Sequence, residues 1–249
     1  MFMEKISIIT PSYNSSSFII ETILSVINQS YLNWEMIIVD DCSTDNTLEI
    51  IKENFKDSRI KLFENEVNYG AAVCRNIGLE NSTGRFIAFI DSDDLWTNDK
   101  LEVQLNFMLN NNYEISFTNY ELVDENSKSF NKFVKSITKI DYHGYLKNTI
   151  IGMSTSMIDM SKIGSFKFVN IRTRQDTYLW ISLLKKGFNA YGIDRNLAKY
   201  RVRNNSISAN KISAAKQVWY LYYSLEKLGY IKSAYYFTFY AYNAIRKRF

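Results

Sequence analysis

The sequence has little proline, cysteine or histidine, and it lacks a long run of apolar residues. Its 249 residues include one proline, two cysteines (Cys42 and Cys74) and one histidine, His143. Two cysteines provide no disulfide framework, and a single histidine argues against a zinc site. No stretch reaches the roughly 18 uncharged apolar residues that a membrane-spanning helix needs. The first residues show no signal-peptide pattern, so we expect a protein of the reducing cytoplasm.

The composition is that of a folded protein with an uneven distribution of charge. Hydrophobic residues make up 46% and charged residues 22%, and nine glycines leave little room for a flexible linker. Residues 211–249 carry seven basic residues, one acidic residue and 12 of the 38 aromatic residues, a net charge of +6. Residues 1–210 have a net charge of −2. We therefore expect a main domain over 1–210 and a basic, aromatic extension over 211–249.

Strand and helix patterns alternate through about the first 95 residues. Short apolar or β-branched runs predict strands at 5–10, 34–39, 59–63 and 85–90, and amphipathic segments between them predict helices. This alternation is typical of a parallel α/β sheet with right-handed connections. The absence of a Gly-x-Gly-x-x-Gly turn argues against a dinucleotide-binding fold.

The pattern after residue 97 is coarser, but it still predicts several elements. It favours helices at 99–109 and 174–184, strands at 114–120, 154–158 and 197–202, a loop or hairpin at 124–139, and two helices at 214–228 and 231–245 separated at Gly229.

Three acidic residues directly follow the apolar run of residues 86–90. Asp91, Asp93 and Asp94 would lie outside the carboxyl end of a buried strand, where ligands of open α/β sheets bind. Asp91 and Asp93 are two positions apart, so an extended backbone would direct both to one side. Such a pair suits Mg²⁺ or Mn²⁺, which favour oxygen ligands. A solvated acidic turn explains this segment equally well when it is considered alone.

Four motifs in order resemble one enzyme family. They are Ile-Ile-Thr-Pro-Ser-Tyr-Asn at 8–14, Val-Asp-Asp-Cys-Ser-Thr-Asp at 39–45, Asn-Tyr-Gly-Ala at 68–71 with Arg-Asn at 75–76, and Asp-Ser-Asp-Asp-Leu-Trp at 91–96. Together they resemble family 2 glycosyltransferases of the GT-A fold, such as those of bacterial surface-polysaccharide synthesis. The resemblance is strong over 5–97 and moderate to about 208. It implies a mostly parallel central sheet flanked by helices, followed here by a helical appendage.

The resemblance also implies a nucleotide-sugar donor, usually a UDP-sugar, a Mn²⁺ or Mg²⁺ ion, and inversion at the anomeric carbon. It assigns metal binding to Asp91 and Asp93. It assigns nucleotide binding to residues spread over all four motifs and a late basic segment: Pro11, Tyr13, Asp40, Asp41, Asn68, Arg75, Ser92 and Arg203. Structural interpretations remain open for several of these. The two acids could belong to a helix-capping cluster, Asn68 to a turn, and the two arginines to exposed surface.

The resemblance places a general base in an acidic pair at the start of a late helix. Here the pair is Gln175-Asp176, followed by Leu179-Trp180, so Asp176 is the expected base. The alternative is an acid placed in the first helical turn because it favours the helix dipole. Gln175 replaces a charged residue and would alter acceptor contacts. Trp96 and Trp180 are candidates for the sugar pocket, although tryptophans at such positions are commonly in the core.

The expected acceptor is a saccharide, lipid-linked in an O-antigen, capsule or related pathway. Tyrosine, tryptophan and basic residues in 211–249 favour contact with the inner membrane surface, and packing on the domain or on a second copy is the alternative. A lipooligosaccharide or protein glycosyltransferase, or a non-catalytic nucleotide-sugar-binding scaffold, would be the other functions. Nucleic acid is not an expected partner, because the basic residues occur among aromatic residues and without a recognition motif.

Overall fold

The computed structural model describes residues 4–203 and 211–246. Strands and helices alternate in its first part as the sequence predicts. The elements are β1 (Ile6–Ser12), α1 (Ile19–Ile27), β2 (Trp34–Asp40), α2 (Thr47–Asn54), β3 (Ile60–Glu64), α3 (Ala71–Glu80) and β4 (Phe86–Phe89).

The rest of the described chain mixes short strands with helices. In order these are β5 (Leu95–Trp96), α4 (Lys100–Asn111), β6 (Ile115–Val123), β7 (Ser129–Val134), β8 (Lys139–Ile140), α5 (Tyr142–Lys147), a 3-10 turn (Met153–Thr155), β9 (Met157–Asp159), α6 (Met160–Ile163), α7 (Gln175–Lys185), β10 (Ala190–Arg201), α8 (Lys211–Tyr220), a π-helical turn (Leu221–Leu225) and α9 (Tyr230–Arg246).

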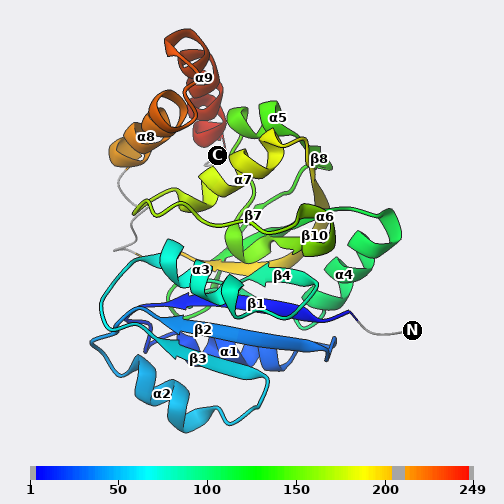
Figure 1. Ribbon diagram of the computed structural model, residues 1–249, viewed down its shortest axis with the longest axis vertical. Helices are drawn as coiled ribbons and strands as arrows, with labels where there is room; N and C mark the ends of the chain where they lie inside the picture. Colours follow the sequence, from blue (N-terminus) through cyan, green and yellow to red (C-terminus); the bar gives the residue numbers. More distant parts are fainter. Residues whose placement is uncertain (1–3, 204–210, 247–249) are drawn as a thin grey trace.

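The described residues form a ten-stranded sheet whose main path runs β3-β2-β1-β4-β9-β6-β10-β5. The first four strands are parallel, and β6 is parallel to β10. β9 lies between these two groups and is antiparallel to both neighbours. The expected central sheet flanked by helices is therefore confirmed, as the layers in Figure 1 show.

Alternate residues of the central strands face opposite helical layers. Ile8 of β1 and Ala88 of β4 pack in one cluster with α1, α2 and α4, whereas Ile9 and Phe89 pack in the other cluster with α5 and α7. Successive side chains of a strand point to opposite faces, and a strand covered on both faces has no polar side. This explains why β1, β2 and β4 are buried at nearly every position.

Two predicted elements differ from the observed ones. The strand expected at 154–158 is a 3-10 turn followed by β9, because Ser156 N donates to Met153 O and delays the extended backbone. The strand expected at 197–202 starts earlier, at Ala190. Its first half is irregular in pattern because its pairing with β6 contains register shifts between Ile193 and Ala198.

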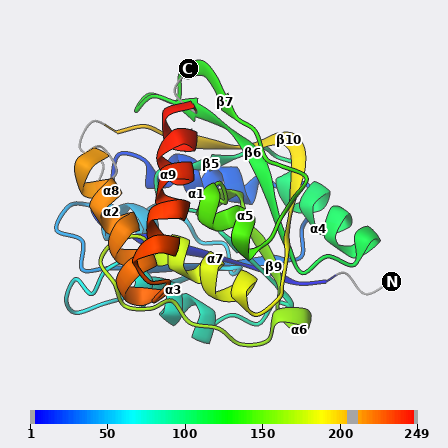
Figure 2. The same cartoon turned by 90° about the horizontal axis from the view of Figure 1, so that it is seen from above.

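The two C-terminal helices pack on the main body (Figures 1 and 2). Val218, Tyr222 and Tyr236 share a buried cluster with residues of α5 and α7, and Tyr222 Oη donates to Leu146 O at 2.6 Å. Gly229, with φ +75°, separates them as predicted. Packing on the domain is thus observed, whereas the division into two parts at 210 stays a prediction. Among the described helices, none is long and apolar enough to cross a membrane.

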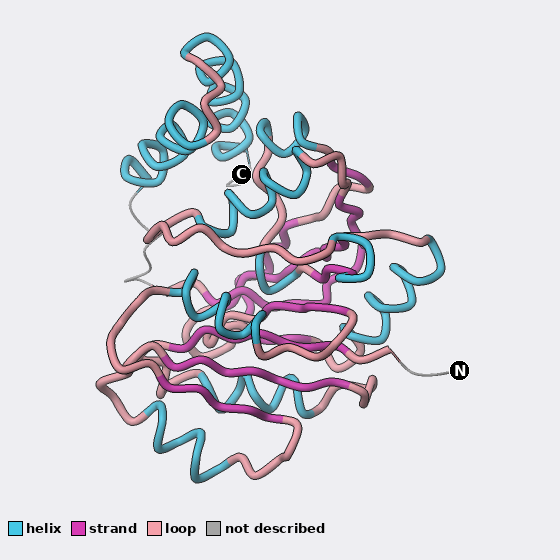
Figure 3. The backbone as a smooth tube through the Cα atoms, viewed as in Figure 1, coloured by secondary structure: helices cyan, strands magenta, loops and turns pink. Residues whose placement is uncertain are grey.

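Figure 3 shows the course of the backbone at the carboxyl ends of the strands. The strands β1 to β4 are parallel, so the loops that follow them leave the same edge of the sheet. Three of the four motifs named above continue into those loops. Ligands of such sheets bind at this edge.

Candidate active site

A cavity of about 660 Å³ opens at the carboxyl edge of the parallel strands. Its volume is in the range of small-molecule sites. Segments far apart in sequence line it: the loops after β1 and β4, the start of α3, the 152–155 turn, the segment 172–176, the end of β10, and α8. The fold therefore assembles one site from nearly the whole length of the chain.

Ten of the fourteen predicted site residues line this cavity. They are Pro11, Tyr13, Asp41, Arg75, Asp91, Ser92, Asp93, Gln175, Asp176 and Arg203. The other four, Asp40, Asn68, Trp96 and Trp180, lie outside the lining of the cavity in the described structure.

The two acids after β2 have different surroundings. Asp40 is fully buried, and its carboxylate accepts hydrogen bonds from the backbone N and the hydroxyl of Ser43, at 2.8 and 2.6 Å. Asp41 reaches the cavity, and it accepts from the backbone N of Tyr69 at 2.9 Å and of Gly70 at 2.7 Å. Asp40 therefore stabilises its own turn, and Asp41 joins that turn to the start of α3. Asn68 forms the turn too, since its amide donates to Asp41 O.

Both tryptophans are core residues, so the expectation that they line the sugar pocket does not hold for this cavity. Trp96 is 4% exposed, and its Nε1 donates to Ser154 O at 2.7 Å. Trp180 is fully buried on the inner face of α7. Their size and apolar character make them effective packing groups, and both support elements that carry site residues.

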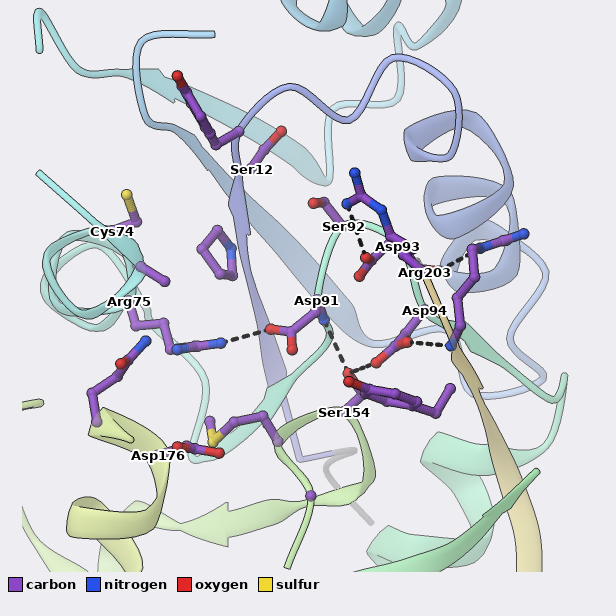
Figure 4. Close-up of a pocket in the computed structure, with 18 of the residues that line it drawn as sticks. Ser12, Cys74, Arg75, Asp91, Ser92, Asp93, Asp94, Ser154, Asp176 and Arg203 are labelled. Atoms are coloured by element: carbon purple, nitrogen blue, oxygen red, sulfur yellow. Dashed lines mark hydrogen bonds and ion pairs between the residues drawn. The ribbon is translucent and has the colours of Figure 1, made fainter. Parts of the chain in front are cut away.

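All three acids of the loop after β4 line the cavity, and one of them, Asp94, is almost fully buried (Figure 4). The carboxylate of Asp94 accepts from the Ser154 hydroxyl and, at 3.0 Å, from the backbone N of Arg201. Ser154 also accepts from the backbone N of Asp91 at 3.1 Å. Asp94 and Ser154 thus hold the loop in place and leave Asp91 and Asp93 directed to the cavity.

Each of the two cavity acids pairs with an arginine from a distant segment. Asp91 Oδ1 lies 2.6 Å from Arg75 Nη2, and Asp93 Oδ2 lies 3.3 Å from Arg203 Nη1. Arg75 is almost fully buried, so its role is not that of an exposed helical arginine. The side-chain amide of Gln175 has hydrogen-bond partners for both its nitrogen and its oxygen in one orientation. In that orientation Gln175 Oε1 accepts a hydrogen bond from Arg75 Nη1 at 3.2 Å. Arg75 therefore connects the acidic loop to the start of α7.

The acids in this loop repel one another. Burial and then the negative charge of Asp91 raise the pKa of Asp93, although Arg203 acts in the opposite direction. Burial, followed by the charges of Asp93 and Asp91, raises the pKa of Asp94 well above its usual value. Like charges that are held close together in a partly desolvated site favour the binding of a cation or the uptake of protons.

Two cavity-facing carboxylates fit the expected Mg²⁺ or Mn²⁺ ion in part. Their oxygens are the ligand type that these ions prefer, and Mg²⁺ commonly uses only one or two carboxylates together with substrate phosphates and water. Within residues 4–203 and 211–246, no three or more His, Cys, Asp and Glu side chains are grouped to hold a metal. The protein therefore offers an open site rather than a complete cage, and Asp91 and Asp93 are the residues that would hold the ion.

Asp176 lies in the first turn of α7 and lines the same cavity as Asp91 and Asp93. Leu179 and Leu183 anchor the inner face of this helix in the core. In Figure 4, Asp176 and Arg203 lie on opposite sides of Asp91. One cavity thus contains an acidic pair from the first half of the chain and a separate carboxylate from the second half.

Several cavity residues escaped the sequence analysis. Ser154 and Arg201 position the acidic loop; the buried Arg201 donates from Nε to Asp93 O at 2.7 Å. Arg172 and Arg174 line the cavity just before Gln175. The only sequence signal for these two was their closeness to the expected base, and no signal marked Ser154.

The comparisons with known proteins now identify the family. The sequence model described as glycosyl transferase family 2 matches residues 7–169. The chain belongs to glycosyl transferase family 2. It is 50% identical over 244 residues to the putative teichuronic acid biosynthesis glycosyltransferase TuaG of Bacillus subtilis, covering 98% of this chain and 97% of that protein. This similarity continues beyond 208 into the C-terminal helices, where the motifs alone indicated none.

A second relative agrees with this assignment, and two solved structures share the GT-A-like fold. WfgD of Escherichia coli, named a UDP-Glc:alpha-D-GlcNAc-diphosphoundecaprenol beta-1,3-glucosyltransferase, is 44% identical, covering 86% of this chain and 83% of that protein. S. aureus TarS 1-349 in complex with UDP-GlcNAc has a TM-score of 0.69 at 20% identity, and the match covers 88% of this chain and 67% of the other chain. The mannosyltransferase PcManGT from Pyrobaculum calidifontis, in complex with GDP-Man and Mn²⁺, also has a TM-score of 0.69, at 17% identity. That match covers 92% of this chain and 66% of the other chain. The two structures support the fold alone.

Proposed function

We propose that the chain is an inverting, metal-dependent glycosyltransferase that moves one sugar from a UDP-sugar to a hydroxyl of a lipid-linked saccharide during surface-polysaccharide synthesis. Membership of family 2 supports the reaction type. The names of TuaG and WfgD, which mention teichuronic acid and a diphosphoundecaprenol-linked sugar, support the pathway and the acceptor.

The observation that carries the proposal is that Asp176 and the pair Asp91 and Asp93 line one cavity. An acceptor hydroxyl is a weak nucleophile, so a carboxylate within hydrogen-bond reach must take its proton as the new bond forms. Inversion requires this base on the face opposite the leaving group. Asp176, which comes from a different half of the chain than the acidic pair, is the group we assign to this role.

The donor side of the proposal uses the residues around the acidic loop. A Mg²⁺ or Mn²⁺ ion held by Asp91 and Asp93 would neutralise charge on the departing diphosphate. Arg203 lies beside Asp93 and can bind phosphate oxygens through its guanidinium. Pro11, Tyr13 and Ser92 line the same cavity and form the remaining nucleotide surface.

The test of the base is the Asp176→Asn variant. Losing a general base lowers kcat by about 10²- to 10⁴-fold, while UDP binding measured by calorimetry should remain unchanged. Asp99→Asn is the matched control, because Asp99 forms an exposed ion pair with Arg195 away from the cavity lining. The configuration of the product, read by NMR, tests inversion. Full activity of Asp176→Asn would refute the assignment.

Membrane contact through α9 is a separate part of this proposal. Tyr230, Ile231, Tyr235, Phe239 and Tyr242 are at least 40% exposed along this helix. Aromatic and basic residues favour the headgroup region of anionic membranes. Replacing Tyr235 and Phe239 with serine should weaken cosedimentation with anionic vesicles and leave the thermal unfolding midpoint nearly unchanged. Equal cosedimentation of the variant and the parent protein would end the membrane proposal.

A further inference from the structure

Basic side chains around the cavity fall into two groups. Arg75, Arg201 and Arg203 pair with Asp91, Glu21 and Asp93. Arg172, Arg174 and Lys199 also line the cavity, but in the described part of the chain they form no ion pair. An arginine without a counter-ion at a cavity wall is available to bind an anionic ligand.

The position of Arg172 and Arg174 assigns them to the side of the expected base. Arg174 directly precedes Gln175, and Arg172 lies two residues before Arg174. The backbone O of Arg174 accepts a hydrogen bond from Tyr178 N in the first turn of α7. Arg174 has a left-handed backbone, with φ +63°, which is uncommon for a residue with a side chain. The backbone of Arg174 is therefore part of the first turn of α7, next to the expected base. The proposed function places the donor phosphates instead beside Asp93 and Arg203, and in Figure 4 Arg203 and Asp176 lie on opposite sides of Asp91.

The C-terminal helices complete this side of the cavity. Ala214 and Gln217 of α8 are part of its lining. Arg174 Nη2 lies 3.4 Å from Tyr240 Oη of α9, so the arginine lies between the expected base and the C-terminal helices. Tyr220 and Tyr223, which follow on the same helical segment as Gln217, are about half exposed. The helical segment that borders the cavity at Gln217 therefore carries exposed aromatic side chains within two turns of it.

We propose that Arg172 and Arg174 bind the phosphate groups that connect the acceptor saccharide to its lipid, and that α8 contacts the first part of the lipid. This inference rests on the proposed function, because it needs an acceptor hydroxyl at Asp176. The sugar lies at the base, the phosphates lie at the two arginines, and the chain of the lipid follows the aromatic residues. The ligand class is a polyprenyl diphosphate or phosphate carrying a saccharide.

A binding experiment tests this site without knowledge of the sugar. The protein is saturated with UDP and Mg²⁺ so that the donor site is filled, and farnesyl diphosphate is titrated by calorimetry. Farnesol and inorganic pyrophosphate are titrated in parallel to separate the lipid from the phosphate contribution. We expect farnesyl diphosphate to bind more tightly than either fragment.

The variants are Arg172→Gln, Arg174→Gln and the double variant, with Lys199→Gln as the matched control. A charge-assisted hydrogen bond accounts for about a tenfold change in affinity or more, so the double variant should bind farnesyl diphosphate at least tenfold more weakly. Lys199→Gln removes one positive charge from the same cavity and should change the affinity by less than about twofold, because it lies on β10 rather than beside Asp176. Restored binding in Arg174→Lys would show that the charge is what matters.

Three results would overturn the inference. The first is unchanged binding of farnesyl diphosphate by the double variant. The second is a loss of affinity in Lys199→Gln as large as that in the double variant, which would indicate that the overall positive potential of the cavity binds the ligand. The third is equal affinity for pyrophosphate and farnesyl diphosphate, which would indicate a site for free phosphate. UDP affinity is measured for every variant. Loss of UDP binding by the parent protein would instead contradict the proposed function, so the two failures are distinguishable.

Discussion

Two acidic centres of this protein lie at opposite ends of the parallel strands and differ in how their charge is balanced. Glu35, near the start of β2, is 2% exposed and lies 3.0 Å from Lys5 Nζ and 2.8 Å from Lys61 Nζ. Its other carboxylate oxygen accepts from Ser7 and from the backbone N of Thr83. At the carboxyl ends, the three carboxylates of Asp91, Asp93 and Asp94 share two arginine partners, Arg75 and Arg203.

The pKa values follow this difference. Burial alone would raise the pKa of Glu35, but hydrogen bonds from Lys61, Ser7 and Thr83 together bring it well below its usual range. The pKa of Asp93 is raised. A fully satisfied carboxylate stabilises the fold, whereas carboxylates that repel one another mark a site that awaits a cationic ligand. The predictions below test this contrast.

Asp93→Asn should show the largest effect, and it should appear in activity. Removing one cation ligand and the charge beside Arg203 should lower kcat/KM by about 10³-fold. The free energy of unfolding without metal should stay the same or rise, because repulsion from Asp91 is lost. Steady-state transfer assays and urea unfolding measure the two quantities. A large loss of stability in this variant would contradict the contrast.

Glu35→Gln should show the reverse pattern. It leaves two lysines without their buried counter-ion, so we expect a loss of roughly 3 kcal/mol in the free energy of unfolding. Transfer activity of the folded protein should be nearly unchanged, since Glu35 is not part of the cavity lining. Urea unfolding at pH 7 and an activity assay at low temperature provide the comparison.

The Glu35→Gln variant also tests how the stability of the protein depends on pH. A carboxyl group whose pKa is lowered on folding adds stability above its unfolded pKa, and this contribution disappears as the pH falls through its folded pKa. The stability difference between the parent protein and Glu35→Gln should therefore be constant near neutral pH and shrink below about pH 4. A difference that grew on acidification would show that Glu35 is not held in its charged form.

The smallest expected effect on stability at neutral pH is that of replacing Lys100. This lysine is buried and has no acidic partner in the described structure. It is fully buried, its Nζ donates to Gln104 Oε1 at 2.7 Å, and it lies over the Trp96 ring. Burial lowers the pKa of Lys100 to about 7. The unfolded chain binds this proton more readily, so the stability of the parent protein should rise between pH 7 and about pH 10.

Lys100→Met is the corresponding test. The variant should be more stable than the parent protein by about 1 kcal/mol at pH 7, since the loss of the bond to Gln104 offsets part of the gain. This advantage should diminish toward pH 10, as measured by urea unfolding at several pH values. A constant difference over this range would show that Lys100 remains charged throughout.

The strength of the sequence patterns decided which parts could be predicted. Four motifs lie after or beside apolar strands, and parallel strands bring their loops to one edge, so Pro11, Tyr13, Asp41, Asp91 and Asp93 were predicted to lie together. The role of Asp40 was harder to predict, because it cannot be told apart from the adjacent acid Asp41 in the sequence alone. Only the fold shows that the turn at Ser43 uses one of them and leaves the other facing the cavity.

The residues that were missed lack a local pattern. Ser154 reaches Asp94 and the backbone of Asp91 from the turn before the neighbouring strand β9, in a segment where the sequence pattern predicted only the start of a strand. Arg201 looks like any strand arginine until its burial is known. The predicted sugar-pocket role of Trp96 and Trp180 was wrong for this cavity, because apolar packing and ligand stacking favour the same side chain.

The sequence by itself determined the alternating first half, the acidic loop at the end of β4, and the family. These depend on side-chain periodicity and on contiguous motifs, which are local properties of the chain. Tertiary structure alone decided that Asp176 shares a cavity with Asp93, that Arg75 and Arg203 pair with the two acids, and that α8 forms a wall. Such contacts join residues far apart along the chain, and they arise only when both faces of the sheet are covered by their helices.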